Sequence, residues 1–210
     1  DWPDRHSRVV KVNDTVAYYI LVYWLLVNIA WSEVDYVIIP INVKDKFHWV
    51  LGVFDICKRI LIVYDSFIAA GNNNAVHQLI NKFSVVIPLF LQCLDFYGKQ
   101  NGINSYIGKS ISEPLKVQWL VTEVPQQKFG SLDCGFYVAI FAEYVSIGEF
   151  SIPNVNFNVE EHRRRFGALL WDYAGRKQEL GAISDSKVTC RTARRRGGPP
   201  KKQRLRVRNK

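Results

Sequence analysis

Residues 124–144 read VPQQKFGSLDCGFYVAIFAEY: an amide pair, a short polar loop, and then an apolar run with the spacing of a helix. This order predicts that Cys134 lies at or just before a helix N-terminus. Unpaired backbone N–H groups and the helix dipole stabilise an anion at that position, and the thiolate anion is the nucleophilic form of cysteine. The alternative is a buried free cysteine beside a turn, because cysteine often serves as a small core residue.

The neighbours of Cys134 add to the nucleophile interpretation. Gly135 has no side chain, so a substrate carbonyl can approach the backbone closely at that point. Gln126 and Gln127 stand upstream of the cysteine. A glutamine side chain can donate an N–H to an oxyanion that develops during acyl transfer.

A histidine and an aspartate lie near the ends of predicted strands. Residues 37–41, 48–56 and 60–67 are rich in Val, Ile, Leu and aromatic residues, and only a short polar turn separates the last two runs. An antiparallel pair joined at that turn places His48 and Asp65 at the same open end, within side-chain reach. The aspartate can then accept one imidazole N–H, so that the other ring nitrogen faces a thiol.

Together with Cys134, this pair predicts the Cys–His–Asp arrangement of an activated nucleophile. Each residue also has an ordinary interpretation, as a strand-edge histidine, a turn aspartate or a core cysteine. The order His, Asp, Gln, Cys within one chain favours the functional interpretation, because the four residue types support one another.

Four short motifs in this order, HW at 48–49, YDS at 64–66, PQQ at 125–127 and DCG at 133–135, resemble the ubiquitin-like-specific cysteine protease family, the SUMO proteases. The resemblance is especially to the divergent plant and transposon-borne branch of the family, and it covers about residues 34–173. It implies an α+β, papain-like cysteine protease fold, with a central, mostly antiparallel sheet flanked by helices and the nucleophile at a helix N-terminus.

The resemblance also implies a role for each residue of the site. His48 is the expected general base and acid, Asp65 its orienting partner and Cys134 the nucleophile, with a glutamine in the oxyanion hole. Trp49 is expected to cover a narrow tunnel that receives a Gly-Gly tail. No metal or cofactor is expected.

The oxyanion glutamine is the point at which this chain departs from the family. The family usually places it six residues before the cysteine, whereas Gln127 stands seven and Gln126 eight residues before Cys134. The loop at 128–132 is therefore expected to be one residue longer. We assign Gln127 to the oxyanion hole, and Gln126 and Gly135 to substrate binding.

Composition divides the 210 residues into three parts. Residues 1–15 are a polar lead-in without the pattern of a signal peptide, and because the chain begins with Asp1 we expect a fragment or an excised domain. Residues 16–180 are the expected papain-like domain, since a 48% hydrophobic content suits a packed core. Residues 181–210 are the expected basic, disordered tail.

Residues 16–31, VAYYILVYWLLVNIAW, form the most apolar segment. The segment is shorter than the roughly 20 residues that span a bilayer. A segment that is apolar on all sides and this short favours a buried core element over membrane contact.

Basic residues gather at the end of the chain. Residues 191–210 hold ten of the 28 Lys and Arg residues and no acid, so the rest of the chain is almost neutral. The segment KKQRLRVRNK resembles a nuclear localisation signal or a sequence-independent nucleic-acid arm, with a merely solubilising terminus as the alternative. Nucleic-acid contact is expected only from this tail and should weaken steeply with salt.

The four cysteines, Cys57, Cys93, Cys134 and Cys190, form no CxxC pair. This spacing predicts free thiols in a reducing compartment, without a disulfide or a zinc site. His77 has no cysteine or histidine at metal-binding spacing, so it is predicted to be a surface or packing residue.

The pattern also predicts the remaining elements. Residues 75–97 are helical but interrupted by Pro88, which predicts two helices or one that ends near Ile87. Residues 116–124 predict a strand that leads into the glutamine pair.

Two helices are predicted in the last third of the domain. The helix after Cys134 is expected to end at Gly148. Residues 159–177 are expected to form the last helix, with an inner face of Phe166, Leu169, Leu170 and Tyr173.

These observations predict a cysteine peptidase or isopeptidase that cleaves after the C-terminal Gly-Gly of SUMO or a related ubiquitin-like modifier, in the nucleus or between nucleus and cytoplasm. One alternative is a catalytically impaired module that binds such a modifier. The other is a transposon-associated nucleic-acid-binding protein that acts through its basic tail.

Overall fold

The computed structural model describes residues 16–17, 20, 29–44, 46–68, 73–98, 112–120, 122–154 and 157–180. The lead-in, the basic tail and most of the apolar segment 16–31 lie outside these residues. The chain divides into two units, one that ends at Val159 and one that begins at Glu160. Each unit is described by itself.

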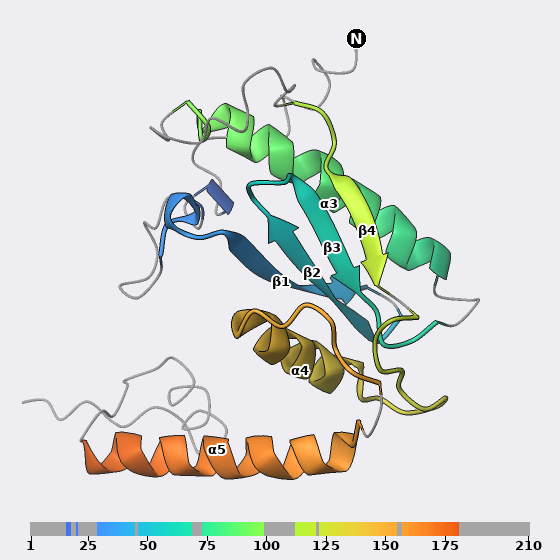
Figure 1. Cartoon of the computed structure of the whole chain (residues 1–210), viewed down its shortest axis with the longest axis vertical. Helices are drawn as coiled ribbons and strands as arrows, with labels where there is room; N and C mark the ends of the chain where they lie inside the picture. Colours follow the sequence, from blue (N-terminus) through green and yellow to red (C-terminus); the bar gives the residue numbers. More distant parts are fainter. Residues whose placement is uncertain are drawn as a thin grey trace, which may run out of the picture. The chain divides into compact units, whose positions relative to one another are not determined.

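The first unit is built on a four-stranded sheet (Figure 1). The strands follow one another in chain order across the sheet; β1, β2 and β3 are antiparallel, and β4 joins β3 in parallel. The predicted α+β class with a mostly antiparallel sheet is confirmed. The elements of this unit are η1 (Trp31–Glu33), β1 (Tyr36–Val43), β2 (His48–Asp55), β3 (Ile60–Tyr64), α3 (Asn73–Cys93), β4 (Lys116–Leu120) and α4 (Cys134–Ser146).

Alternation along the strands gives the sheet two apolar faces. On β2, Val50 and Phe54 belong to the core cluster that includes α3, whereas Leu51 and Val53 belong to the cluster that includes α4. Successive side chains of a strand point to opposite faces, so a continuous apolar run can contact a helix on each side. Figure 1 shows α3 and α4 on opposite faces of the sheet.

The turn between β2 and β3 sets their register. The Asp55 carboxylate accepts a hydrogen bond of 2.8 Å from the Lys58 backbone N–H and pairs with the Lys58 ammonium group at 3.1 Å, which raises the pKa of Lys58. Arg59 completes the turn with a φ of 57°. Leu51 is consequently paired with Tyr64, and the start of β2 lies beside the end of β3.

Pro88 does not interrupt its helix, and the prediction of a break near Ile87 was wrong. α3 continues from Asn73 to Cys93 with the proline inside it. A proline lacks the N–H that would bond to the carbonyl four residues earlier, here Ser84. The Leu115 backbone N–H donates to that carbonyl at 2.8 Å, so tertiary structure supplies the missing donor.

Other predicted elements differ in extent. The strand expected over 116–124 ends at Leu120. The helix after Cys134 ends as predicted, with Ile147 as the C-cap and Gly148 in the left-handed region at a φ of 86°. His77 packs its ring on Trp119, with centroids 4.0 Å apart, in agreement with the predicted packing role.

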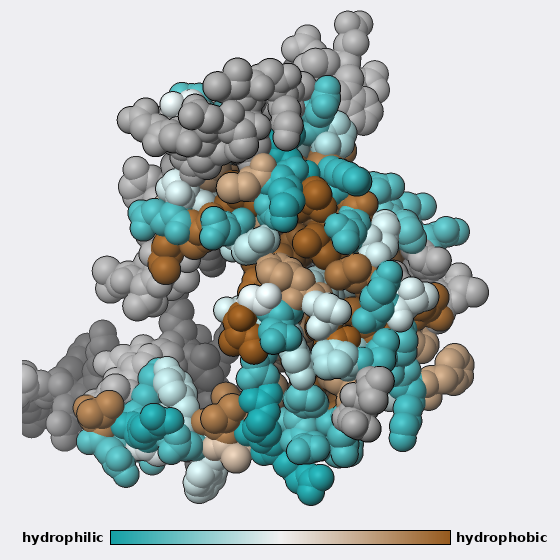
Figure 2. All heavy atoms as spheres, in the orientation of Figure 1, coloured by the Kyte–Doolittle hydropathy of each residue, from teal (hydrophilic) through white to brown (hydrophobic). Residues whose placement is uncertain are grey.

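α5 (Val159–Glu179) carries nearly all of the described part of the second unit. It contains no buried residue, and Leu169, Leu170 and Tyr173 of the predicted inner face are exposed, so this burial prediction was wrong. Figure 2 shows apolar side chains among hydrophilic ones on the surface of this helix.

The described part of the apolar segment contributes to the core. Ala17 and Ile20 are helical and are buried in the cluster that includes α3. Within the described ranges, no helix combines the length and the apolar character that a membrane span requires.

Candidate active site

His48 is the first residue of β2, and its side chain is 2% exposed. Its Nε2 lies 2.8 Å from Asp65 Oδ1. Asp65 directly follows β3, and the same Oδ1 accepts a 2.9 Å hydrogen bond from the Phe67 backbone N–H. The predicted contact between the two side chains is therefore present. An Nε2–H donated to Asp65 leaves the lone pair on the other ring nitrogen, Nδ1.

Cys134 is the first residue of α4 and is 4% exposed. Its Sγ lies 3.5 Å from the backbone carbonyl oxygen of Phe47, the residue before His48. The thiol thus meets the sheet at the start of β2, although 87 residues separate the two positions in the sequence. The sequence-based prediction of a cysteine at a helix N-terminus is confirmed.

Phe47 presents its carbonyl to the thiol through an uncommon backbone conformation. Its φ is 49°, in the left-handed region, and its side chain is exposed. Bulky residues rarely adopt this region, and such a conformation costs about 1–3 kcal/mol when the surrounding structure enforces it. The sequence carried no signal for this feature, because the required conformation follows from the tight turn between β1 and β2.

The two glutamines occupy different environments. The Gln126 side chain donates its amide N–H to the Asp65 backbone carbonyl at 2.9 Å and to the Val124 carbonyl at 3.3 Å. The Gln127 backbone N–H donates to the Ser66 carbonyl at 2.8 Å. These contacts hold the glutamine segment along the chain that follows β3.

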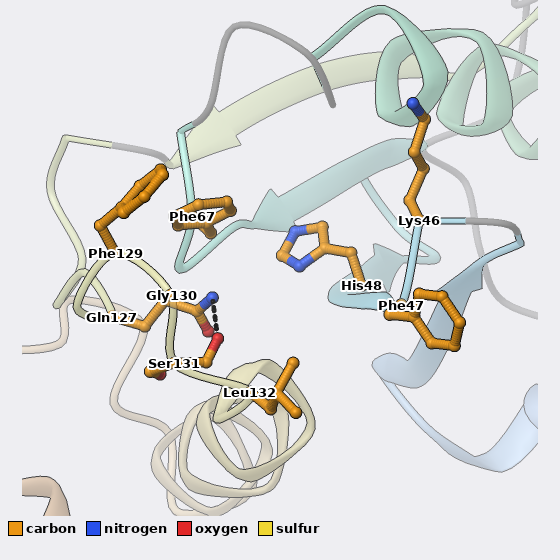
Figure 3. A pocket seen from close by; sticks show the side chains of 9 residues that line it. All are labelled: Lys46, Phe47, His48, Phe67, Gln127, Phe129, Gly130, Ser131 and Leu132. Carbon is orange, nitrogen blue, oxygen red and sulfur yellow. Dashed lines mark hydrogen bonds between the residues drawn. The ribbon is translucent and has the colours of Figure 1, made fainter.

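Gln127 is the glutamine that lines the same pocket as His48 (Figure 3). Its side-chain Nε2 donates to the Ser131 carbonyl over a long 3.4 Å, and its Oε1 is buried without a partner among the described residues. Because an amide nitrogen carries two N–H groups, one donor remains for a ligand. Figure 3 shows the amide end directed toward His48.

The loop between Gln127 and Cys134 closes in a local turn. The Ser131 N–H donates to the Lys128 carbonyl at 3.1 Å, and Gly130 adopts a φ of 78°. Ser131 Oγ then donates to the Asp133 carboxylate at 2.9 Å. A turn of this kind absorbs the length of the loop, so Cys134 still reaches the start of β2.

The glutamine segment is also tied to the helix that carries the thiol. The Tyr137 hydroxyl donates to the Gln126 carbonyl at 3.2 Å. Burial, with a smaller contribution from the Asp133 carboxylate, raises the pKa of Tyr137, so this hydroxyl remains a donor at neutral pH.

Trp49 and Gly135 form a second, separate part of the site. Trp49 is partly exposed, and a Cβ placed on Gly135 would lie 3.8 Å from its Cδ1. The indole therefore lies beside the first turn of α4, and a methyl group at Gly135 would make only an ordinary contact.

The pocket beside His48 has a volume of about 320 Å³. Within the described residues, no three His, Cys, Asp or Glu side chains gather in a way that would hold a metal ion. The pocket is lined by Lys46, Phe47, His48, Phe67, Gln127, Phe129, Gly130, Ser131 and Leu132.

A thiol at a helix N-terminus that contacts the residue before an aspartate-bound histidine is the arrangement expected of the papain-like class of cysteine hydrolases. The sequence model described as "Ulp1 protease family, C-terminal catalytic domain" matches residues 27–170. This chain belongs to the Ulp1 protease family, and its fold is the α+β, papain-like cysteine protease fold.

Several solved structures are similar to this chain. The SUMO protease Ulp1 with its catalytic cysteine oxidised to a sulfonic acid is 23% identical, with a TM-score of 0.37, over 63% of this chain and 49% of that chain. The form oxidised to a sulfinic acid is 22% identical, with a TM-score of 0.42, over 71% of this chain and 55% of that chain.

A third structure is the C-terminal Ulp1 protease domain in complex with Smt3, the yeast ortholog of SUMO; it is 25% identical, with a TM-score of 0.36, over 62% of this chain and 48% of that chain. The chain thus spans about half the length of the solved structures it matches. Comparison with curated proteins gave no match.

Proposed function

We propose that this chain is a cysteine peptidase or isopeptidase that cleaves after the C-terminal Gly-Gly of SUMO or a related ubiquitin-like modifier, in deSUMOylation or precursor processing. The observation that carries the proposal is the 2.8 Å contact between His48 Nε2 and Asp65 Oδ1 at the place where the Cys134 thiol meets the sheet. Membership of the Ulp1 protease family supports the reaction class. The HW, YDS and DCG motifs support the substrate class.

The reaction begins with proton transfer from the Cys134 thiol to His48 Nδ1, because Nε2 is engaged by Asp65. The thiolate attacks the carbonyl carbon of the terminal glycine. The resulting oxyanion accepts hydrogen bonds from the Cys134 backbone N–H at the helix N-terminus and from the Gln127 amide. The imidazolium then protonates the departing amine, and water hydrolyses the thioester with His48 again acting as base.

Asp65 and Gln126 position the base. Asp65 holds the imidazole by one oxygen atom, and the Phe67 N–H holds that oxygen in place. The Gln126 amide in turn donates to the Asp65 backbone carbonyl. This chain of hydrogen bonds keeps the ring oriented while its charge changes during the reaction.

Trp49 and Gly135 receive the acyl side of the scissile bond. The partly exposed indole of Trp49 covers the tail, and Gly135 has no side chain to obstruct its approach to the first turn of α4.

The test is covalent labelling with SUMO and ubiquitin probes that carry an electrophile in place of the terminal carboxyl. We expect an adduct with the SUMO probe that disappears in Cys134→Ala and persists in Cys93→Ala, a matched control at an exposed cysteine. A ubiquitin preference would keep the reaction and change the modifier. Tight modifier binding without any adduct by the folded chain would favour a catalytically impaired binding module.

The basic residues 191–210 support a separate proposal about location. We propose that the tail directs the protein to the nucleus and contacts nucleic acid without sequence preference. A fluorescent fusion of the full chain should accumulate in nuclei, and one with the ten basic residues replaced by Gln should not. Equal distribution of both fusions would contradict the proposal.

A further inference from the structure

The pocket beside His48 has an unusually apolar and exposed rim. Phe47, Phe129 and Leu132 line it and are 87%, 92% and 85% exposed. Single exposed apolar residues are ordinary on protein surfaces, but several on one rim mark a place where another molecule binds. The proposed mechanism uses none of these side chains.

Aromatic rings connect this rim to the imidazole. The Phe67 ring packs edge-on against His48 with centroids 6.1 Å apart, and Phe129 packs against Phe67 at 6.2 Å. Figure 3 shows Phe67 between His48 and Phe129. Phe67 and Phe129 thus form an aromatic wall of the pocket. The hydrogen bond from the Phe67 backbone to Asp65 holds the Phe67 end of this wall in place.

The wall lies on the side of the site that the Gly-Gly tail does not use. Trp49 and Gly135, which receive the acyl side in the proposed function, are absent from the residues that line the pocket. His48 does line it, and His48 is the group that protonates the departing amine. A peptide bond held at Cys134 therefore has its acyl side at Trp49 and its amine side in the aromatic pocket.

We infer that this pocket is the leaving-group subsite of the enzyme and that it selects an apolar or aromatic residue directly after the Gly-Gly sequence. The inference rests on the proposed function and names the substrate feature that the same site recognises. Among the described residues that line the pocket, Lys46 is the one Lys, Arg, Asp or Glu, so no carboxylate is among them. The pocket therefore offers a cationic side chain no counter-charge and offers Phe or Leu an apolar surface.

The experiment measures kcat/KM on SUMO precursors that end in Gly-Gly-X followed by one common short peptide, with X as Phe, Leu, Ala, Asp or Lys. We expect Phe and Leu to be cleaved about tenfold faster than Ala, Asp or Lys, the discrimination typical of one apolar side chain in a pocket. The Phe-to-Ala ratio should fall to about 2 or less in Phe129→Ala. The ratio should not change in Ile147→Ala, a control at an exposed residue at the opposite end of α4.

A charge variant makes the test independent of any general loss of activity. Phe129→Asp places a carboxylate on the rim, so it should raise the Lys-to-Phe ratio several-fold relative to the wild type. Because Phe129 is almost fully exposed, neither substitution removes a core contact.

The outcomes separate this inference from the proposed function. Cleavage without preference for X, or the same preference in Phe129→Ala, overturns the subsite and leaves the protease intact. Failure of the folded wild type both to cleave any precursor and to react with the SUMO and ubiquitin probes overturns the protease and, with it, the subsite.

Discussion

His48, Asp65 and Cys134 are almost fully buried, whereas Phe47, Phe129 and Leu132, which line the pocket beside His48, are almost fully exposed. Hydrogen bonds and core packing hold the three buried side chains in place, whereas the exposed residues of the rim lie in turns and loops. Rigid burial suits residues that must keep one geometry through a reaction, while an exposed rim can vary without unfolding the chain. The contrast predicts large effects on chemistry from the first set and small effects on stability from the second.

The largest effect is expected at the nucleophile. Cys134→Ser should lower turnover of a SUMO precursor by on the order of 10⁶-fold, because a hydroxyl is a far poorer nucleophile at neutral pH. Circular dichroism should show an unchanged fold. Cys93→Ser, at an exposed cysteine, should retain wild-type turnover. Normal turnover by Cys134→Ser would remove the assigned nucleophile.

Asp65 should rank second. Asp65→Ala is expected to lower kcat by about 10³-fold, since the imidazole loses the group that orients it. Asp65→Asn should cost less, because an amide oxygen can still accept from both His48 and the Phe67 N–H. Steady-state kinetics with both variants tests this order, and an equal loss in the two would show that charge matters more than orientation.

A matched pair of phenylalanines tests the contrast in stability. Phe141 on α4 is fully buried in the core cluster between α4 and the sheet. Phe141→Ala should therefore lower the free energy of unfolding by about 3–5 kcal/mol. Phe129→Ala should change it by less than about 0.5 kcal/mol. Urea unfolding of both variants gives the two values. A similar loss in both would mean that the rim is part of the core.

A smaller effect than that of Phe141→Ala is expected at Tyr64, the buried residue directly before Asp65. Its hydroxyl donates to the Phe150 carbonyl at 3.0 Å, and burial raises its pKa to about 12. Tyr64→Phe should cost about 1 kcal/mol at neutral pH.

The raised pKa of Tyr64 also predicts the direction in which stability changes with pH. An unfolded tyrosine loses its proton near pH 10, whereas the folded residue keeps it until about pH 12. Stability from this group is therefore complete below pH 10 and is lost as pH rises toward 12. Unfolding of wild type and Tyr64→Phe across this range should show a smaller decline for the variant, and parallel curves would contradict the assignment.

The part of the site made by neighbouring elements was predictable from sequence. His48 and Asp65 belong to one antiparallel pair joined by a short turn, so alternation and turn chemistry place them together. Cys134 stands at the start of a periodic apolar segment that ends at a glycine in the left-handed conformation. Such features depend on contacts within a few residues, which local sequence specifies well.

Three features were outside the reach of that reasoning. Pro88 predicted a broken helix, yet the helix continues because the Leu115 N–H donates a hydrogen bond to the freed carbonyl of Ser84. The apolar spacing of α5 predicted a buried face, yet its leucines are exposed. Phe67 and Phe129 were not singled out, because nothing local relates two rings that stack across separate loops.

The sequence by itself determined which chemical groups are available, in which order, and which of them begin or end an element. Tertiary structure alone decided which of the two adjacent glutamines bonds to the backbone and which faces the pocket. Gln126 bonds to the backbone at Asp65, and Gln127, held by the Ser66 carbonyl, turns toward His48. Neighbours in an irregular segment have no periodicity to assign their directions, so contacts with the distant segment that follows β3 decide them.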